Sequence, residues 1–180
     1  MKRTLLLVIV AACGSDPVNY SQPVGIELKA KSGDVSGTVV TEQKDITTES
    51  GNPFGAFVSD ATHMLGRDPS RIELDDLTLT LGAQSTGVSG LEQVVASVNI
   101  EFLVNDTNNT YGAGEVVNPT GVGPVPVTTT FRWEAVSDID RAKMLGGGFK
   151  VVIIAPAAVG FSTKGAEASL QTTFTFTAFE

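Results

Sequence analysis

Two side chains able to do demanding chemistry occur once each in the chain: the thiol of Cys13 and the imidazole of His63. A Ser/His/Asp triad or a histidine-based metal cluster would have to be built around His63. No His, Cys or Glu stands near His63 at ligand spacing, and no G-x-S-x-G motif is present. We therefore interpret His63 as a helical histidine that either faces solvent or has its hydrogen bonds satisfied, and we predict no catalytic residue, no metal site and no cofactor.

Acidic residues form two candidate calcium sites, because carboxylates and amides are the ligands that this ion prefers. The stretch Asp106-Thr107-Asn108-Asn109 begins like a calcium loop, but Tyr111 stands where that loop has glycine and Val117 where it has glutamate. We interpret it as an asparagine-rich turn and leave calcium binding open. Asp75-Asp76 interrupts an alternating pattern, which predicts a β-bulge with two solvated charges.

The segment from 133 to 148 offers two further patterns with a chemical interpretation. Glu134 could pair with Asp138 or Asp140 as the two acids of a glycosidase. Ser137 can instead cap a helix over 138–145, and acidic residues in its first turn favour the helix dipole, so we prefer that interpretation. Gly146-Gly147-Gly148 then follows a helix and precedes a strand, which predicts a helix stop rather than a phosphate loop.

Two aromatic residues are candidate contacts for a ligand or a partner. Trp133 is the only tryptophan, and Tyr111 lies in a polar, turn-rich segment. Either ring could serve as a platform for a sugar or a protein surface. For Trp133 an anchoring role in the core or at its rim is the simpler interpretation.

The N-terminus explains why the single cysteine lies where it does. Lys2 and Arg3 precede an apolar run from Leu5 to Val10, and small residues follow before Cys13. This order of basic, apolar and small regions is typical of a secretory signal peptide. A bilayer span needs roughly 20 apolar residues, so a permanent membrane helix is a poor interpretation of this short run.

The four residues Val10-Ala11-Ala12-Cys13 resemble the lipobox of bacterial lipoproteins. The resemblance covers only the leader, and it implies cleavage before Cys13 and acylation of its thiol with palmitate-type chains. Gly14 follows the cysteine in place of the aspartate that retains such proteins at the inner membrane, which favours the outer membrane. The alternative is an ordinary signal peptide cut after Ala12, which would leave a free thiol.

Composition limits the partners of the mature protein. Two of the 12 basic residues, Lys2 and Arg3, belong to the leader, so its removal would change the net charge from −8 to about −10. Such a charge argues against nucleic acid and against electrostatic adhesion to anionic lipid. We therefore expect the lipid on Cys13 to hold the protein on its membrane.

Periodicity in the remaining chain predicts mostly strands. Alternating apolar residues indicate strands over 23–31, 72–81, 94–104, 125–135, 149–157 and 170–179. Val35 to Thr41 could return as a hairpin partner of the first strand, and Glu42 to Gly51 is predicted as a loop with a short edge strand near Ile46. Helical spacing appears at 53–65, between a capping Asn52 and a terminating Gly66.

These elements predict a mainly β protein: an antiparallel β-sandwich, or a partly closed barrel, with one or two short helices. We expect a signal peptide over 1–12, a flexible tether over 13–22 and one domain over 23–180. Three functions are compatible with the sequence: an interaction or assembly module with an envelope protein partner, a small-ligand or glycan binder, and an enzyme. An uncovered sheet edge would favour the first, an aromatic cleft the second and a pocket of convergent carboxylates the third.

Overall fold

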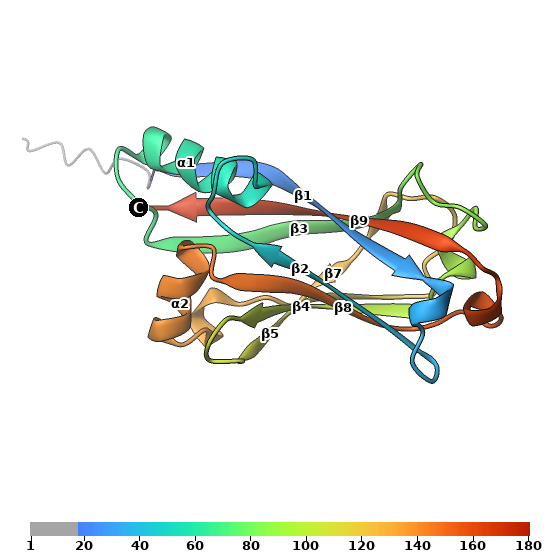
Figure 1. Cartoon of the computed structure of the whole chain (residues 1–180). Coiled ribbons are helices and arrows are strands. Elements are labelled where there is room, and N and C mark those ends of the chain that lie inside the picture. Colours follow the sequence, from blue (N-terminus) through green and yellow to red (C-terminus); the bar gives the residue numbers. More distant parts are fainter. Residues whose placement is uncertain (1–17) are drawn as a thin grey trace, which may run out of the picture.

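The computed structural model describes residues 18–180 as two antiparallel sheets packed face to face (Figure 1). The first sheet has the strand order β1-β9-β3-β6 and the second has the order β2-β8-β4-β5-β7. The predicted mainly β, antiparallel sandwich is confirmed, and the sheets do not close into a barrel. The strands of the first sheet are β1 (Asn19–Lys31), β9 (Glu167–Phe179), β3 (Arg71–Leu81) and β6 (Val125–Pro126). Those of the second are β2 (Val39–Ile46), β8 (Phe149–Pro156), β4 (Ser97–Val104), β5 (Thr110–Val117) and β7 (Thr128–Thr129).

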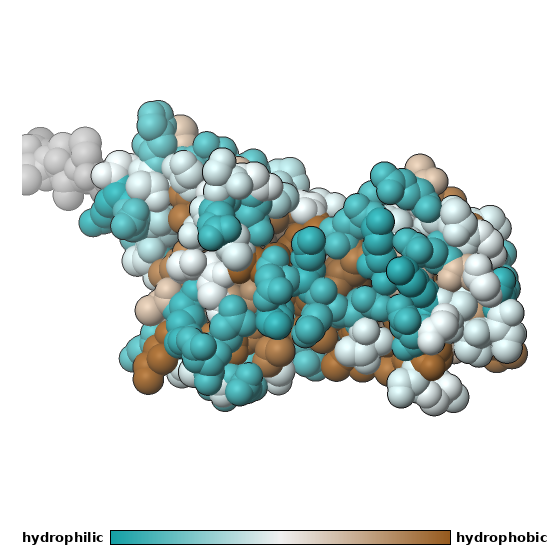
Figure 2. All heavy atoms as spheres, viewed as in Figure 1, coloured by the Kyte–Doolittle hydropathy of each residue, from teal (hydrophilic) through white to brown (hydrophobic). Residues whose placement is uncertain are grey.

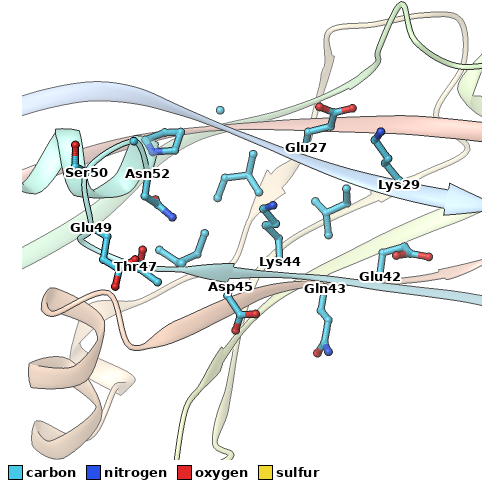
Figure 3. A pocket seen from close by; sticks show the side chains of 16 residues that line it. Glu27, Lys29, Glu42, Gln43, Lys44, Asp45, Thr47, Glu49, Ser50 and Asn52 are labelled. Atoms are coloured by element: carbon cyan, nitrogen blue, oxygen red, sulfur yellow. The ribbon is translucent and has the colours of Figure 1, made fainter.

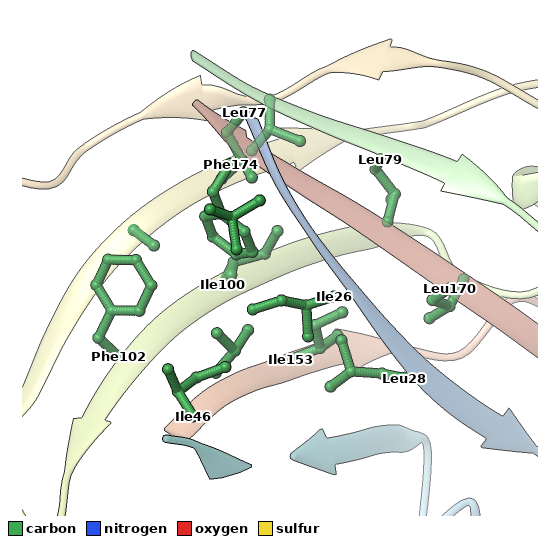
Figure 4. Close-up of a cluster of buried hydrophobic side chains, with 14 of the residues drawn as sticks. Ile26, Leu28, Ile46, Leu77, Leu79, Ile100, Phe102, Ile153, Leu170 and Phe174 are labelled. Carbon is green, nitrogen blue, oxygen red and sulfur yellow. The ribbon is translucent and has the colours of Figure 1, made fainter. Parts of the chain in front are cut away.

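Side chains from the inner faces of both sheets fill the core between them (Figure 4). Phe102 on β4 lies at the centre of an aromatic cluster, with its ring centroid 5.4 Å from Phe149 and 5.7 Å from Phe174. Phe102 and Phe174 belong to different sheets, so their contact joins the two layers directly. Burial of such rings supplies a large part of the hydrophobic stabilisation of a sandwich.

The first predicted helix is confirmed as α1 (Pro53–Leu65). The Asn52 side chain accepts a hydrogen bond from the backbone N–H of Phe54 at 3.0 Å, and Gly66 ends the helix with φ 72°. Phe54 and Phe57 pack against Phe176 of β9, so the apolar side of this helix covers one end of the sandwich. Met64, in the last turn of the helix, is exposed.

The second predicted helix is confirmed as α2 (Asp138–Leu145), capped by Ser137, whose hydroxyl accepts from the backbone N–H of Asp140 at 3.2 Å. The glycine run ends it as predicted: Gly147 has φ 73°, and a Cβ there would lie 2.7 Å from the backbone nitrogen of Thr48. Both the conformation and the close approach require glycine. Both helices lie at the end of the sandwich where the chain ends (Figure 1).

The first residues of β1 and β4 differ from the prediction, and backbone hydrogen bonds explain both differences. β1 begins at Asn19, inside the segment 13–22 that we predicted as a tether, because residues 19–22 pair with residues 176–179 of β9. β4 begins at Ser97 rather than at Val94. Val94 and Val95 donate to the carbonyl of Leu91 and close a short 3-10 turn, η2 (Leu91–Gln93), before the strand.

The bulge at Asp75-Asp76 is confirmed as a register shift of β3 against β9. Asp75 is exposed and accepts a hydrogen bond from the Thr177 hydroxyl. The extra residue restores the inward phase at Leu77, which is fully buried. The change of phase in the sequence therefore reported the local structure correctly.

The predicted strand over 125–135 is wrong. Val127 donates to Leu77 in the first sheet, whereas Thr130 donates to Ala113 in the second, so the chain crosses between the sheets. Pro124 and Pro126 have no N–H to offer to a continuous ladder, which limits β6 to two residues. Residues 133–135 then form a 3-10 turn, η3 (Trp133–Ala135).

The predicted hairpin between 23–31 and 35–41 is also wrong. The chain turns through η1 (Ser32–Asp34), and β2 pairs with β8 in the other sheet. β2 runs to Ile46, so it includes half of the segment that we predicted as a loop. β1 and β2 lie at the edges of different sheets and face each other along one side of the sandwich, with a groove between them.

Candidate functional site

A groove of about 710 Å³ lies between the edge strands β1 and β2 (Figure 3). Its floor is formed by apolar side chains of both strands, including Ile26, Leu28 and Ile46, and its rim is charged. In the space-filling view, apolar residues are visible between the polar ones in the middle of this face (Figure 2). The lining comprises residues 25–29 of β1, residues 42–46 of β2, and Thr47, Glu49, Ser50, Gly51, Asn52 and Pro53.

The free edge of β1 follows from the hydrogen bonds of its neighbour β9. Ser169 accepts from Gly82, and Glu167 exchanges both backbone bonds with Thr86, so the odd-numbered residues of β9 bond toward β3. The even-numbered residues of β9 therefore bond β1, and their partners are the even-numbered residues of that strand. Gly25, Glu27 and Lys29 consequently direct their N–H and C=O groups toward the groove.

The free edge of β2 is found in the same way. Ala157 donates to Thr38, and the β2–β8 register then assigns the even-numbered residues of β2 to β8. The odd-numbered residues point away from β8. Val39 uses its outward groups in two hydrogen bonds with Ser36. Within residues 18–180, the N–H and C=O groups of Thr41, Gln43 and Asp45 are then free for a partner strand.

The inner face of β2 carries an unusual pair of charges. Glu42 and Lys44 share this face with Val40 and Ile46, which are both buried. In Figure 3, Lys44 extends toward β1, whereas Gln43 and Asp45 extend from the other face of the strand. Burial raises the pKa of the Glu42 carboxyl, as does the charge of Asp34, whereas Lys31 lowers it. Within residues 18–180, neither Glu42 nor Lys44 forms an ion pair.

The edge of β1 is less suited to a partner strand than that of β2. Pro23 occupies an outward-facing position and has no N–H to donate. Lys29 and Lys31 lie on the outer face and reach Glu167 at 4.0 and 3.9 Å. Proline and lysine are residues that natural proteins place on sheet edges to discourage pairing.

No family model matches the chain, and no curated protein is similar to it. In the described part of the chain, no helix is long and apolar enough to cross a membrane. Residues 18–180 also contain no group of three or more His, Cys, Asp or Glu side chains placed to hold a metal ion. The candidate function therefore rests on the groove and its edges, together with the N-terminal motif.

The structure connects Tyr111 with the acidic residues that we considered for catalysis. Asp140 is fully buried at the start of α2 and accepts hydrogen bonds from the Tyr111 hydroxyl at 2.6 Å and from Asn109 and Thr107 at 2.8 Å. The bond from Tyr111 is the main reason that the pKa of Asp140 lies well below its usual range, although desolvation opposes it. The loop at 106–109 thus holds α2 against β5.

Replacing Tyr111 by phenylalanine tests this structural role. The change removes one donor from a buried carboxylate, and we expect the free energy of unfolding to fall by about 1–2 kcal/mol. Urea denaturation followed by circular dichroism measures the loss. An unchanged midpoint would show that the Tyr111 hydroxyl does not hold α2 in solution.

Replacing Asp140 by asparagine predicts a change in the pH dependence of stability. Because folding lowers the pKa of Asp140 below its ordinary value of 3.8, its contribution is present above about pH 4 and is lost as the pH falls further. The variant should be less stable than the wild type at pH 7, and the difference should shrink toward pH 2. Unfolding curves at several pH values measure this convergence, and a constant difference would contradict it.

Trp133 is buried in η3, with 5% of its surface exposed. It packs edge-on against Phe131, and the Arg141 guanidinium lies 5.9 Å from its ring. Arg141 also donates to the backbone carbonyls of Trp133 and Glu134 and pairs with Asp138. The ring therefore anchors the turn before α2, and it offers no open aromatic platform.

The other predicted positions are dispersed. His63 is exposed in the last turn of α1, Asp106 pairs with Lys143 at 2.6 Å, and Cys13 with its lipobox lies outside the described residues. Glu42 and Lys44 were missed because they occupy inward positions where a strand pattern calls for apolar residues. Val40 and Ile46 lie an even number of residues apart, on the same face as Glu42 and Lys44. This spacing is the signal that could have extended the predicted strand through Glu42 and Lys44.

Proposed function

We propose that the protein is a non-catalytic bacterial envelope lipoprotein, anchored to the outer membrane through Cys13, whose sandwich binds a protein partner at the open edge of β2. The anchoring half of the proposal rests on the resemblance of Val10-Ala11-Ala12-Cys13 to a lipobox. The binding half is carried by one observation: in the part of the chain that the structure describes, no strand pairs with the outward backbone donors and acceptors of Thr41, Gln43 and Asp45.

The short distance between anchor and domain supports this proposal. Five residues lie between Cys13 and Asn19, where β1 begins, so at most about 20 Å of chain separates the two Cα atoms. A domain held this close to a lipid surface meets its partners mainly by lateral encounter. The edge between β1 and β2 is a side of the sandwich rather than an end, and it is therefore well placed for such encounters.

Site-specific photo-crosslinking in native envelopes tests the proposal. A crosslinking amino acid at Gln43 should capture one defined protein in stoichiometric amount, because this side chain lies at the centre of the free edge. The same amino acid at Ser59, which is exposed on α1 and does not line the groove, is the matched control. Equal or absent capture at the two positions would contradict an interaction at β2.

A further inference from the structure

The free edge of β2 has a sequence that complements itself when it is reversed. Residues at equal distances before and after Gln43 form three pairs: Glu42 with Lys44, Thr41 with Asp45, and Val40 with Ile46. When two copies of this strand run antiparallel with the two Gln43 residues facing each other, each acidic inner position meets a basic one. The polar Thr41 likewise meets the polar Asp45, and the apolar Val40 meets the apolar Ile46.

The backbone of β2 fits the same register. The free N–H and C=O groups lie at Thr41, Gln43 and Asp45, and the bonds between Val39 and Ser36 close the edge on one side. In the antiparallel register centred on Gln43, Thr41 faces Asp45 of the second copy and Gln43 faces Gln43. Each such facing pair exchanges two hydrogen bonds, so all the free groups of this edge are used in both copies.

The inner charges then become partners across the seam. Glu42 and Lys44 occupy non-hydrogen-bonded positions, where side chains directly opposite each other come closest. Glu42 would lie opposite Lys44 of the second copy, and Lys44 opposite its Glu42. In one copy alone, Glu42 is half-buried beside Ile153 and Lys44 lies beside the buried Val151. A second copy therefore supplies the opposite charges that these side chains do not contact within residues 18–180.

We propose that β2 is the interface of a homodimer, in which two copies pair antiparallel about a twofold axis at Gln43 and join their five-stranded sheets into one. This inference rests on the proposed function and names the partner as a second copy of the chain. The twofold axis is perpendicular to the joined sheet. Both β1 strands therefore lie over the same face of that sheet. Five residues of strand pairing form a small interface, and the dimer consequently relies on the proposed lipid anchor to concentrate the two copies.

Disulfide formation at Gln43 reports this register directly. In a hydrogen-bonded antiparallel pair the facing Cα atoms lie about 5.5 Å apart, within the range that a disulfide spans. The Gln43→Cys protein, at full length in its native envelope, should give a disulfide-linked dimer under mild oxidation. In Thr41→Cys the two new thiols would be four residues apart along the seam, about 13 Å, and should not link. The wild type reports any link formed through Cys13.

Charge reversal in the Gln43→Cys background tests the pairing of Glu42 with Lys44. Glu42→Lys and Lys44→Glu each replace two attractive pairs by two repulsive ones, and each should reduce dimer formation about tenfold. The double reversal restores both attractive pairs and should recover the original yield. Thermal unfolding of each variant verifies that the sandwich is retained, which we expect because Lys44 is exposed and Glu42 is only half-buried.

Equal linking of the Gln43→Cys and Thr41→Cys proteins, or no recovery in the double reversal, would overturn the homodimer. Membrane fractionation of the same samples separates this result from a failure of the proposed anchor. If the protein does not sediment with membranes, the oxidation is repeated on the purified full-length protein at high concentration, where the register predicts the same preference for position 43. Absence of that preference in purified protein would again reject the homodimer.

Discussion

Replacing Cys13 by alanine is expected to move the protein almost completely from the membrane fraction to the soluble fraction. The anchor that we propose consists of two or three acyl chains, and each buried methylene contributes about 0.8 kcal/mol to membrane binding. No electrostatic attraction to anionic lipid replaces it, because the mature chain would carry a net charge of about −10. Fractionation of the envelope and immunoblotting measure the distribution.

The control for this change is Ser15→Ala, which alters the segment after the cysteine but keeps the thiol. That variant should remain with the membrane. The released Cys13→Ala domain should unfold at the temperature of the anchored protein, since the core described between residues 18 and 180 does not include residue 13. Full retention of Cys13→Ala on membranes would contradict the proposed anchor.

Replacing Phe102 by alanine is expected to cause a larger loss of stability than the Tyr111 or Asp140 substitutions. The side chain is fully buried and contacts Phe131, Phe149, Phe174 and Phe176, so both sheets lose packing at one point. Truncation of a buried phenylalanine costs about 3–5 kcal/mol, a large part of the roughly 5–15 kcal/mol by which domains are stable. Urea denaturation measures the change.

Val117→Ala is the matched control, because this side chain on β5 is 69% exposed. Its free energy of unfolding should change by less than about 0.5 kcal/mol. A loss below about 1 kcal/mol in Phe102→Ala would mean that the two sheets do not depend on this aromatic cluster, and the packing of the sandwich described above would have to be revised.

The elements that local chemistry determines were predicted well. Asn52, Pro53 and Gly66 define both ends of α1 without help from the rest of the chain, and Ser137 does the same for the start of α2. The Asp75-Asp76 bulge was also visible, because a one-residue insertion shifts the alternation of a strand. Each of these signals is contained within a few neighbouring residues.

Features that depend on the partner sheet were missed. The sequence of β2 carries Glu42 and Lys44 at inward positions, and only the openness of the sandwich at this edge lets a strand keep charges there. The crossing from β6 to β7 was hidden in a similar way, since Val125, Val127 and Thr129 alternate although they bond to different sheets. An alternation of apolar and polar residues indicates which face of a strand each side chain lies on, but it does not indicate which strand pairs with it.

The role of Tyr111 shows a third limit of sequence reasoning. Its hydroxyl donates to Asp140, which lies 29 residues later in the chain, and nothing in either local sequence indicates the other. We considered Tyr111 as a ligand contact and Asp140 as a helix-capping acid, and the structure joins them in one hydrogen-bond network. Such long-range polar contacts arise from the tertiary packing that brings the start of α2 beside β5, which the sequence alone does not specify.

Mass spectrometry of the mature N-terminus is the most direct test of the membrane anchor on which the proposed function depends. We predict that residues 1–12 are removed and that residue 13 is the first residue, with its mass raised by covalently attached acyl chains. An unmodified cysteine at this position, or an intact leader beginning at Met1, would contradict the proposed anchor.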